Sequence, residues 1–569
     1  MLHKNLPQKD FLLLFMNFLS LKKNLRNDYS AFQNYRLAIL ADAEMQFLKQ
    51  ALRGAAYEHE IDLEIFTGNI GTFAETAELK HFQPHGVLLY YSLPALKRSF
   101  YQTPLVERQN FYARHLNTIK NTIESLSFSP QNIFFSIHDL ASDEVYGQQG
   151  FQNENSFLFQ LLKIQHELSQ YVQLKNQVGL LSIASSYFNA PFFYATQSDI
   201  SLEAMPQVAY QLLQMLNARL GKMKKCVIVD LDNTLWGGIV GDDGWENLEL
   251  GNLKRGKVFE DIQLWLRELK DRGVVLVVCS KNEESTAKEV FEKHPDMVLD
   301  LEDFAFFVAN WKAKSENVHH ILASLNISEE HVLFLDDNPA ERALVKEIFP
   351  RLTVPDLPKD PSDWIVFLQK QNLFEAANLS EEDRFRTKKY QQNARRNMSV
   401  QDIASIESYL KSLEMKAKIL PIDSFTLPRV AQLLQRTNQF NLRTVRHSET
   451  EITKMLKEDC IGFAFSLQDK FGEEGIVSTV LLKKETDYFT VDTWVMSCRV
   501  FGRGLEMLVF NEIVRLAILH KKKIKAEYIP SYKNQLVKDK LKEMGLIEID
   551  GVFELSPTEK NLQTHYIEL

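Results

Sequence analysis

The chain of 569 residues is long enough for about three or four domains of roughly 100–200 residues each. Hydrophobic residues make up 45% of the chain and charged residues 25%, an ordinary globular composition that excludes a large disordered fraction. The net charge of −9 argues against general nucleic-acid binding, which usually shows a basic surface.

The four cysteines form no CxxC motif, so the sequence offers neither a disulfide framework nor an evident zinc site. The longest apolar run, "FLLLFMNFLSL" at 11–21, is shorter than the ~20 residues that cross a bilayer. No small-residue cleavage site follows it, which favours a packed helix over a secretion signal. We therefore expect a cytoplasmic protein with no membrane partner.

Residues 1–220 predict an α/β domain. Short apolar runs alternate with helical stretches such as 153–177, and a long helix is predicted over 205–225. This alternation indicates βαβ units around a parallel sheet. The strand candidates are 35–40, 61–67, 86–91 and 132–137.

A second α/β pattern spans residues 221–360 and ends in the proline-spaced run 349–361. A charged helical linker is predicted over 380–396. The strand candidates are 226–230, 274–279, 297–300, 305–308 and 332–336, and the helix candidates are 257–272, 283–293 and 315–326.

The last domain, 375–569, mixes helices and strands without regular alternation, which predicts an α+β fold. Its helix candidates are 400–413, 427–437, 448–457 and 505–520, and its strand candidates are 461–467, 475–484 and 488–500.

The stretch "KKCVIVDLDNTLWGG", residues 224–238, carries the first chemical signal. An apolar strand runs into Asp230 and Asp232, which places both acids at the carboxyl end of the sheet, where open α/β sheets bind ligands. Two neighbouring carboxylates repel each other unless a cation or a shared proton relieves them. Mg²⁺ is bound by one or two carboxylates together with phosphate oxygens and water. The stretch therefore predicts a magnesium-dependent phosphate site.

"DLDNT", residues 230–234, resembles the DxDx(T/V) signature of the haloacid dehalogenase (HAD) superfamily of phosphohydrolases. The other signature elements follow in order, each next to a predicted strand or helix. The alternative is a Rossmann-like sheet with incidental acids, but buried unpaired acids are costly. The elements are Ser280 after strand 274–279, Lys314 or less favourably Lys312 in "NWKAKSEN" (310–317), and Asp336 with Asp337 in "HVLFLDDNPAER" (331–342).

The resemblance implies a role for each residue. Asp230 attacks phosphorus and forms an aspartyl phosphate, and Asp232 protonates the leaving oxygen and then activates water. The phosphoryl oxygens are held by Ser280, Lys314 and Thr234. Mg²⁺ lies between Asp230, the backbone carbonyl of Asp232 and one acid of the Asp336–Asp337 pair, with Asp337 favoured.

Little room is left for a covering cap domain. Only short segments separate Leu235 from the next helix and Asn282 from Lys314. The site is therefore expected to be open or covered by neighbouring domains, and an open site suits a large substrate such as a group carried on a protein.

Longer motifs resemble the FkbH family over residues from about 200 to the end, and less clearly before that. They are "DLDNTLWGGIVGDDG" (230–244), "CSKN" (279–282), "FLDDNPAER" (334–342), "RTNQFNLRT" (436–444) and "WVMSCRVFGRGLE" (494–506). The resemblance implies an SGNH-hydrolase-like N-terminal region, a HAD domain and a GNAT-like C-terminal region.

The family is associated with polyketide extender units. Its members take 1,3-bisphosphoglycerate, remove a phosphate and deliver a glyceryl group to the phosphopantetheine thiol of an acyl carrier protein. The resemblance therefore implies a phosphorylated three-carbon substrate and an acyl carrier protein as partner.

"RVFGRG", residues 499–504, fits the R-x-x-G-x-G/A turn of GNAT acyltransferases between a strand and helix 505–520. Backbone N–H groups at a helix N-terminus bind phosphate, so the turn is a candidate site for acyl-CoA or phosphopantetheine. The alternative is a plain strand–helix connection. The candidate residues are Arg499, Gly502, Arg503 and Gly504.

An enzyme thioester is one route for acyl transfer. Cys279, next to Ser280, is the first candidate, although adjacent strand side chains point to opposite faces and buried cysteines are common. Cys498, near the glycine turn, is the second candidate, whereas Cys226 and Cys460 are predicted to be structural.

Other expected groups are absent or weak. No serine follows the strand at 35–40, so the N-terminal domain is predicted to be hydrolytically inactive, and His85 and His138 are interpreted as satisfied polar residues. The C-terminal region offers no clear general base, and Glu473 and Glu474 are assigned to a solvated turn.

Two functions fit the sequence. The first is a phosphatase–acyltransferase that serves a carrier protein, and the second is a phosphatase of a small metabolite whose flanking domains only bind or scaffold. A non-enzymatic role ranks last because both motif aspartates are present.

Overall fold

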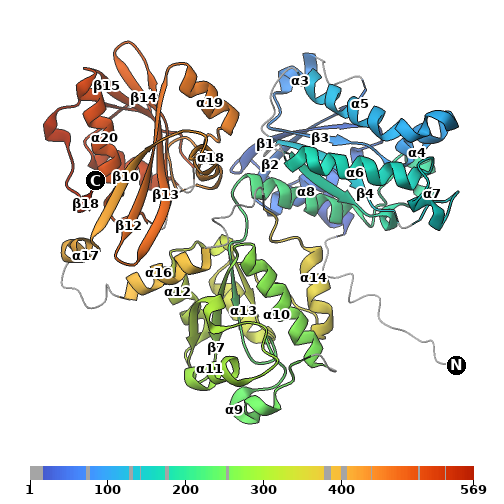
Figure 1. The fold of residues 1–569 in the computed structure, drawn as a ribbon, viewed down its shortest axis with the longest axis horizontal. Coiled ribbons are helices and arrows are strands. Elements are labelled where there is room, and N and C mark those ends of the chain that lie inside the picture. Colours follow the sequence, from blue (N-terminus) through green and yellow to red (C-terminus); the bar gives the residue numbers. More distant parts are fainter. Residues whose placement is uncertain are drawn as a thin grey trace. The chain divides into compact units, whose positions relative to one another are not determined.

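The computed structural model describes residues 17–71, 77–126, 132–140, 142–173, 178–251, 255–376, 386–398, 406–437, 439–497, 500–531 and 534–569. The chain divides into two compact units, Met1–Arg219 with Val366–Asn378 and Leu220–Ile365 with Leu379–Leu569. The described residues form three sheets, one in the first unit and two in the second (Figure 1).

The first unit contains a five-stranded parallel sheet in the order β2-β1-β3-β4-β5. This is the order of flavodoxin-like doubly wound folds, and it agrees with the predicted α/β class. The sequence did not predict β5. The strands are β1 (Gln33–Ala41), β2 (Ile61–Asn69), β3 (Gly86–Tyr90), β4 (Asn132–His138) and β5 (Val178–Ile183).

Helices cover the sheet of the first unit on both faces (Figure 1). The predicted helix 205–225 ends earlier, at Arg219, and Gly221 has a positive φ of 73°. The helices are α1 (Phe18–Asn24), α2 (Gln46–Glu58), α3 (Ala77–Phe82), α4 (Leu93–Gln102), α5 (Phe111–Ser125), α6 (Phe157–Gln173), α7 (Ala190–Thr196) and α8 (Met205–Arg219).

The second unit begins with a four-stranded parallel sheet in the order β8-β7-β6-β9. Its strands are β6 (Cys226–Val229), β7 (Val275–Ser280), β8 (Phe304–Ala309) and β9 (Val332–Leu335). Its helices are α9 (Val240–Asp243), α10 (Gly256–Asp271), α11 (Glu284–Lys293), α12 (Lys314–Leu325) and α13 (Pro339–Ile348), and α14 (Trp364–Lys370) follows.

The predicted strand 297–300 is wrong. The backbone N–H groups of Val298 and Leu299 donate to the side-chain oxygen of Gln263 on α10, at 3.0 and 3.2 Å, instead of pairing with a strand. A side-chain acceptor from a neighbouring helix thus satisfies this apolar segment, which local sequence cannot reveal.

The C-terminal sheet is mixed and nine-stranded, in the order β16-β17-β15-β14-β13-β12-β10-β18, with β11 paired to β14. The predicted α+β class is confirmed, although the sequence did not predict β10 or the strands after β14. The strands are β10 (Met415–Pro421), β11 (Phe440–Asn441), β12 (Cys460–Asp469), β13 (Gly472–Lys484), β14 (Tyr488–Met496), β15 (Lys523–Glu527), β16 (Ile547–Ile549), β17 (Val552–Leu555) and β18 (Ile567–Glu568).

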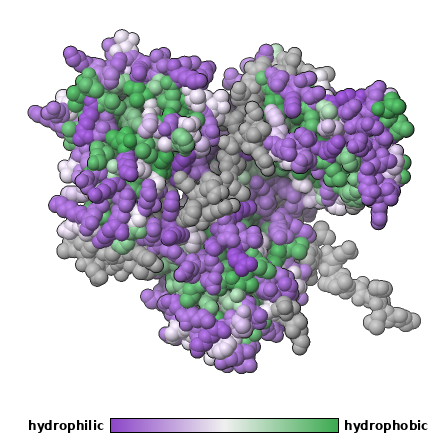
Figure 2. Space-filling model, viewed as in Figure 1, coloured by the Kyte–Doolittle hydropathy of each residue, from purple (hydrophilic) through white to green (hydrophobic). Residues whose placement is uncertain are grey.

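The helices of this last part are α16 (Arg386–Met398), α17 (Ile406–Ser412), α18 (Leu427–Arg436), α19 (Glu449–Lys457), α20 (Leu505–Leu519) and α21 (Gln535–Glu543). The predicted helix 400–413 corresponds to α17, and its first residues lie outside the described part. Among the described helices none combines the length and the hydropathy that crossing a bilayer requires. In Figure 2, hydrophilic residues predominate and hydrophobic ones form scattered patches.

Helices α1 and α2 approach closely at Gly54. A Cβ atom built at this residue would lie 2.0 Å from the backbone oxygen of Leu21, which has no room to move. Glycine is therefore required here by packing.

We expect Gly54→Ala to lower the free energy of unfolding of the first unit by about 1–3 kcal/mol, the usual range for overpacking. Denaturant unfolding measures the change. Gly71→Ala is the control, because a Cβ there meets only Asn69 Oδ1 at 3.4 Å. Equal stability of the two variants would contradict the packing requirement.

Candidate active site

The predicted site residues of the HAD domain meet at one edge of its sheet. Asp230 follows β6, Ser280 ends β7 and Asp336 follows β9, so three parallel strands deliver them at their carboxyl ends. Lys314 is the first residue of α12, which follows β8. The Asp230 N–H donates to Leu335 O at 2.9 Å and fixes the first acid against the neighbouring strand.

Lys314 lies among the acids. Its Nζ lies 2.8 Å from Asp230 Oδ2 and also contacts Asp336 Oδ2, and all three side chains are buried. Burial alone would lower the pKa of Lys314, but the Asp230 and Asp336 carboxylates raise it well above its usual value. The alternative, Lys312, is exposed, so of the two candidate lysines Lys314 is the one placed beside the acids.

Three carboxylates crowd this edge. Oxygens of Asp230, Asp336 and Asp337 lie within 4.8 Å of one another. Burial, and next the Asp230 charge, raises the pKa of Asp336 to about 7, and the same causes raise the pKa of Asp337. One lysine compensates only part of this negative charge, so the oxygen-rich set fits a divalent cation such as Mg²⁺.

Among the described residues the Asp337 carboxylate forms no ion pair, and the Asn338 N–H donates to it. The Asp336 carboxylate is already held by Lys314 and by the Asn338 N–H at 2.9 Å. Asp337 is thus the freer ligand, in keeping with the preference drawn from the sequence.

The Asp232 carboxylate is not part of the group of three acids and is held by three donors. Trp236 Nε1 and the Val240 N–H donate to Oδ1 at 2.9 and 3.1 Å, and Asn282 Nδ2 donates to Oδ2 at 3.0 Å. Burial raises the pKa of Asp232 despite these donors, which suits a group that must give and take a proton.

Several positioning residues had no role in the sequence analysis. Trp236 and Asn282 orient Asp232, and Arg342 Nη1 donates to the backbone oxygens of Asp336 and Asp337, both at 2.7 Å. All three lie within the motifs quoted above, which was the only signal available for them.

Ser280 and Thr234 are buried beside the acids. Ser280 Oγ accepts from Asn282 Nδ2 at 3.2 Å, and Thr234 Oγ1 accepts from the Asp337 N–H at 3.2 Å. The hydroxyl of Thr234 therefore joins the first and last motifs, which makes it a positioning residue in this structure.

Cys279 lies next to the phosphate site but is not exposed to it, with Sγ 3.9 Å from the backbone oxygen of Lys314. Its side chain is fully buried in a hydrophobic cluster with Ile228 and Val318, on the face of β7 opposite Ser280. Burial raises the pKa of the Cys279 thiol to about 12, so it is neither ionised nor accessible at neutral pH. This placement argues against an enzyme thioester at Cys279.

A short flap replaces a cap domain. Gly237 and Glu249 exchange backbone hydrogen bonds of 3.0 and 2.8 Å, and the four-residue helix α9 lies between them. The segment between Leu235 and α10 is therefore too small to enclose a substrate.

The C-terminal candidates are only partly described. Gly502 and Gly504 have positive φ values of 79° and 86°, and Gly504 is the N-cap of α20, as a tight strand–helix turn requires. Arg499 and Cys498 lie outside the described residues. Binding of a phosphate or cofactor by this turn stays a prediction.

The guanidinium of Arg503 is buried against two carboxylates, with Nη1 3.2 Å from Asp469 Oδ2 and 3.4 Å from Glu474 Oε1. Glu473 and Glu474 do not form the expected turn, and only Glu473 is exposed as expected. Both lie in β13, and Glu474 is fully buried because it pairs with Arg503, which is distant in sequence.

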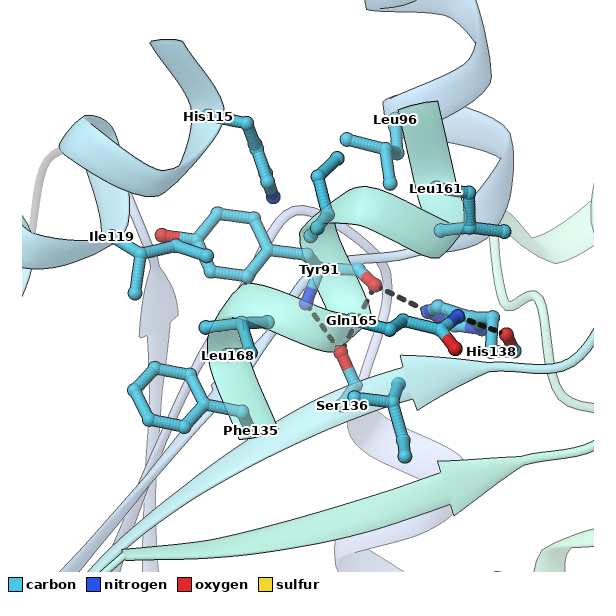
Figure 3. A pocket seen from close by; sticks show the side chains of 12 residues that line it. Tyr91, Leu96, His115, Ile119, Phe135, Ser136, His138, Leu161, Gln165 and Leu168 are labelled. Atoms are coloured by element: carbon cyan, nitrogen blue, oxygen red, sulfur yellow. Dashed lines mark hydrogen bonds between the residues drawn. The ribbon is translucent and has the colours of Figure 1, made fainter. Parts of the chain in front are cut away.

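A small apolar pocket in the first unit lies between β4 and helices α5 and α6 (Figure 3). Its polar groups serve the fold. Ser136 Oγ accepts from the Tyr91 N–H at 2.8 Å, and His138 Nε2 lies 2.6 Å from Tyr91 O. Burial lowers the pKa of His115 to about 4, so it is neutral. His138, like His85, whose Nδ1 accepts from the Arg36 N–H at 3.0 Å, is a satisfied polar residue.

Comparison with known proteins gives a consistent family. Residues 36–217 match the family described as FkbH, N-terminal domain, and residues 246–344 match the haloacid dehalogenase-like hydrolases. A crystal structure of the N-terminal part of the protein BF1531 from Bacteroides fragilis, containing a phosphatase domain complexed with Mg, is 33% identical, with a TM-score of 0.61. That comparison covers 64% of this chain and 100% of that chain. The chain belongs to the FkbH-like family.

Two solved acetyltransferase structures match about a quarter of this chain. The ribosomal-protein-S18-alanine N-acetyltransferase of Escherichia coli is 16% identical over 26% of this chain and 99% of its own, with a TM-score of 0.20. The GNAT domain of S. lividans PAT is 16% identical over 24% of this chain and 88% of its own, with a TM-score of 0.19. No curated protein matches the chain.

This FkbH-like protein is therefore a HAD-type phosphatase with a parallel-sheet α/β catalytic domain and an acidic group that can hold a metal ion. The fold class predicted from the sequence is confirmed.

We expect Asn282→Ala to lower kcat/KM for phosphate release about 10- to 150-fold, the cost of one hydrogen bond to a charged group. Because this hydrogen bond lowers the pKa of Asp232, its loss moves the alkaline limb of the pH–rate profile upward. The exposed Lys281→Gln, whose Nζ reaches Glu341, is the control. An unchanged alkaline limb in the pH–rate profile of Asn282→Ala would contradict the assignment of Asp232 as the acid.

Mg²⁺ should stabilise the folded protein more at high pH than at low pH. Since the pKa of Asp336 rises from its usual value near 4 to about 7 on folding, the metal-free protein loses stability as pH rises between these values. Mg²⁺ replaces the proton, so at 100 times its Kd it should add about 2.7 kcal/mol at pH 8 and much less at pH 5.5. Thermal unfolding with Mg²⁺ or EDTA measures this. Asp337→Asn should reduce the effect, and a Tm increase independent of pH would contradict it.

Proposed function

We propose that the protein removes a phosphate from 1,3-bisphosphoglycerate and loads the glyceryl group onto the phosphopantetheine thiol of an acyl carrier protein, for polyketide-type biosynthesis. The observation that carries the phosphatase half is the cluster of Asp230, Lys314, Asp336 and Asp337 at the carboxyl edge of the sheet. Membership of the FkbH-like family supports the second half.

The phosphatase steps follow from the geometry. An Asp230 oxygen attacks phosphorus as the bond from phosphorus to the leaving oxygen breaks, and Asp232 gives its proton to that oxygen. Asp232 then takes a proton from the water that cleaves the aspartyl phosphate. Lys314 and Ser280 offset the charge on the phosphoryl oxygens. A bound Mg²⁺ would add positive charge beside those oxygens.

The transfer accounts for the second phosphate. When the carrier thiol attacks the acyl carbon, a C–S bond forms and the C–O bond to the acyl phosphate breaks, so that phosphate leaves with the electron pair. The other phosphate, an ester, is the one removed at Asp230. Two phosphates are thus released for each glyceryl thioester.

The second candidate is a stand-alone phosphatase of a small phosphorylated metabolite. It is favoured by one observation, which is that the Cys279 thiol is fully buried and not accessible to a substrate. In that case the flanking domains bind or scaffold.

The test is to incubate the protein with Mg²⁺, 1,3-bisphosphoglycerate and a phosphopantetheinylated acyl carrier protein, and to follow both proteins by intact-mass spectrometry. We expect the glyceryl mass on the carrier with the wild type and its absence with Asp230→Asn. Cys279→Ala should retain transfer, because its thiol lies in the core. An unmodified carrier beside rapid phosphate release would favour the stand-alone phosphatase.

A further inference from the structure

The C-terminal sheet opens between two of its parallel strands. β14 and β15 pair only over Tyr488–Val491 and Lys523–Ala526. Beyond this point β14 pairs with β11 through Val495 and Met496. Because β13 occupies the other edge of β14 along the same length, β11 lies at the edge that β15 has left.

A β-bulge marks the place where the strands separate. Leu481 and Leu482 of β13 face Thr493 and Val491 of β14, so Asp492 is an extra residue without a partner in the ladder. Bulges change the direction of a side chain and are frequent next to active sites. The Asp492 side chain is nonetheless almost fully buried, at 1% exposure.

Two cations compensate the Asp492 carboxylate. Arg443, which follows β11, places Nη2 2.6 Å from Asp492 Oδ1, and Lys483 places Nζ 2.6 Å from the same oxygen. Arg443 also bridges the opening, since its Nη1 lies 3.0 Å from Glu527 Oε2 on β15. Two cations and two carboxylates therefore balance without any contribution from histidine.

His447 completes the group. Its Nε2 lies 2.8 Å from Asp492 Oδ2, and its side chain is 15% exposed. Within the described residues Nδ1 has no hydrogen-bond partner. Burial alone would raise the pKa of Asp492, but the hydrogen bond from His447 and the cations lower it far below its usual value. Because Asp492 stays ionised, it accepts a hydrogen bond from the Nε2–H of His447 and favours that tautomer. The lone pair of His447 Nδ1 is then free to accept a proton.

We propose that His447 and Asp492 form a general-base pair that deprotonates the acyl-accepting thiol in the C-terminal domain, with His447 Nδ1 as the acceptor and Asp492 as the positioning residue. This inference rests on the proposed function and assigns the thiol-activating group of its transfer step. The sequence offered no base in this domain, because His447 and Asp492 are separated by 45 residues.

The chemistry balances with the donor already named. The thiol proton passes to His447 Nδ1, the sulfur attacks the acyl carbon, a C–S bond forms, and the C–O bond to the leaving phosphate breaks. The proton then passes from His447 to solvent or to the phosphate. Thiols ionise near pH 8.5, so a base is needed at neutral pH.

The experiment compares thioester formation on the carrier by the wild type, His447→Gln and His520→Gln across pH 6.5–9. His520 is an exposed histidine at the end of α20 and serves as the control. Phosphate release from p-nitrophenyl phosphate and thermal unfolding check that each variant is folded. We expect His447→Gln to lower the transfer rate about 10²-fold at pH 7, the contribution of one general base, and to approach the wild type at pH 9, where the thiol ionises unaided.

Other titratable groups near the pair are Lys483, Arg443, Glu527 and Cys460, which faces Lys483 across the sheet. Burial raises the pKa of Cys460 to about 11, so it should not produce a step in the neutral range. A wild-type transfer rate in His447→Gln at every pH would overturn the assignment of the base and leave the proposed function standing.

A wild type that makes no thioester would contradict the proposed function itself. The assignment is then decided by modification of the full chain with diethylpyrocarbonate, followed by mass spectrometry of the peptide containing His447. Protection by pantetheine, relative to His520, would support a thiol site at this pair. Equal modification with and without pantetheine would overturn it.

Discussion

Electrostatic repulsion among Asp230, Asp336 and Asp337 is the constraint on which the catalytic domain depends. Three carboxylates within 4.8 Å at a buried sheet edge are unfavourable unless positive charge is supplied. Lys314 supplies part of it from the start of α12, and the remaining negative charge makes the edge a cation site. The paired parallel strands β6 and β9 hold these side chains together although the carboxylates repel one another.

The rest of the site divides into groups that react and groups that place them. Asp232 is held by Trp236, Val240 and Asn282 and is not part of the group of three acids, so one strand end carries an acid for attack and an acid for proton transfer in separate environments. Thr234 ties the two acidic loops together by accepting from the Asp337 N–H, and Arg342 fixes the second loop by donating to the backbone oxygens of Asp336 and Asp337. The alternation of side chains along β7 also separates Ser280 from Cys279. Ser280 contacts Asn282, whereas Cys279 is buried in the core beneath Lys314.

The sequence predicted those strands and site residues whose signal lies in adjacent positions of the chain. Apolar runs ending in acids identified β6 and β9 and the acids that follow them, because the buried apolar residues and the charged residues are neighbours in the sequence. The strand expected at 297–300 failed because Gln263, distant in sequence, satisfies its backbone. Glu474 was misplaced for a similar reason, since its burial depends on Arg503. The dyad of His447 and Asp492 had no local signature at all, because a bulge in β14 and the segment after β11 bring it together.

The sequence by itself thus determined the HAD motifs, the family and the order of the domains, because each of these depends on residue types at short spacing. Only the tertiary structure placed Lys314 rather than Lys312 beside the acids, buried Cys279 in the core and paired Arg503 with Asp469 and Glu474. These outcomes depend on which side chains meet across sheets and helices and on how strongly burial shifts their charge. Contacts between distant residues and the desolvation that follows from them cannot be read from spacing along the chain.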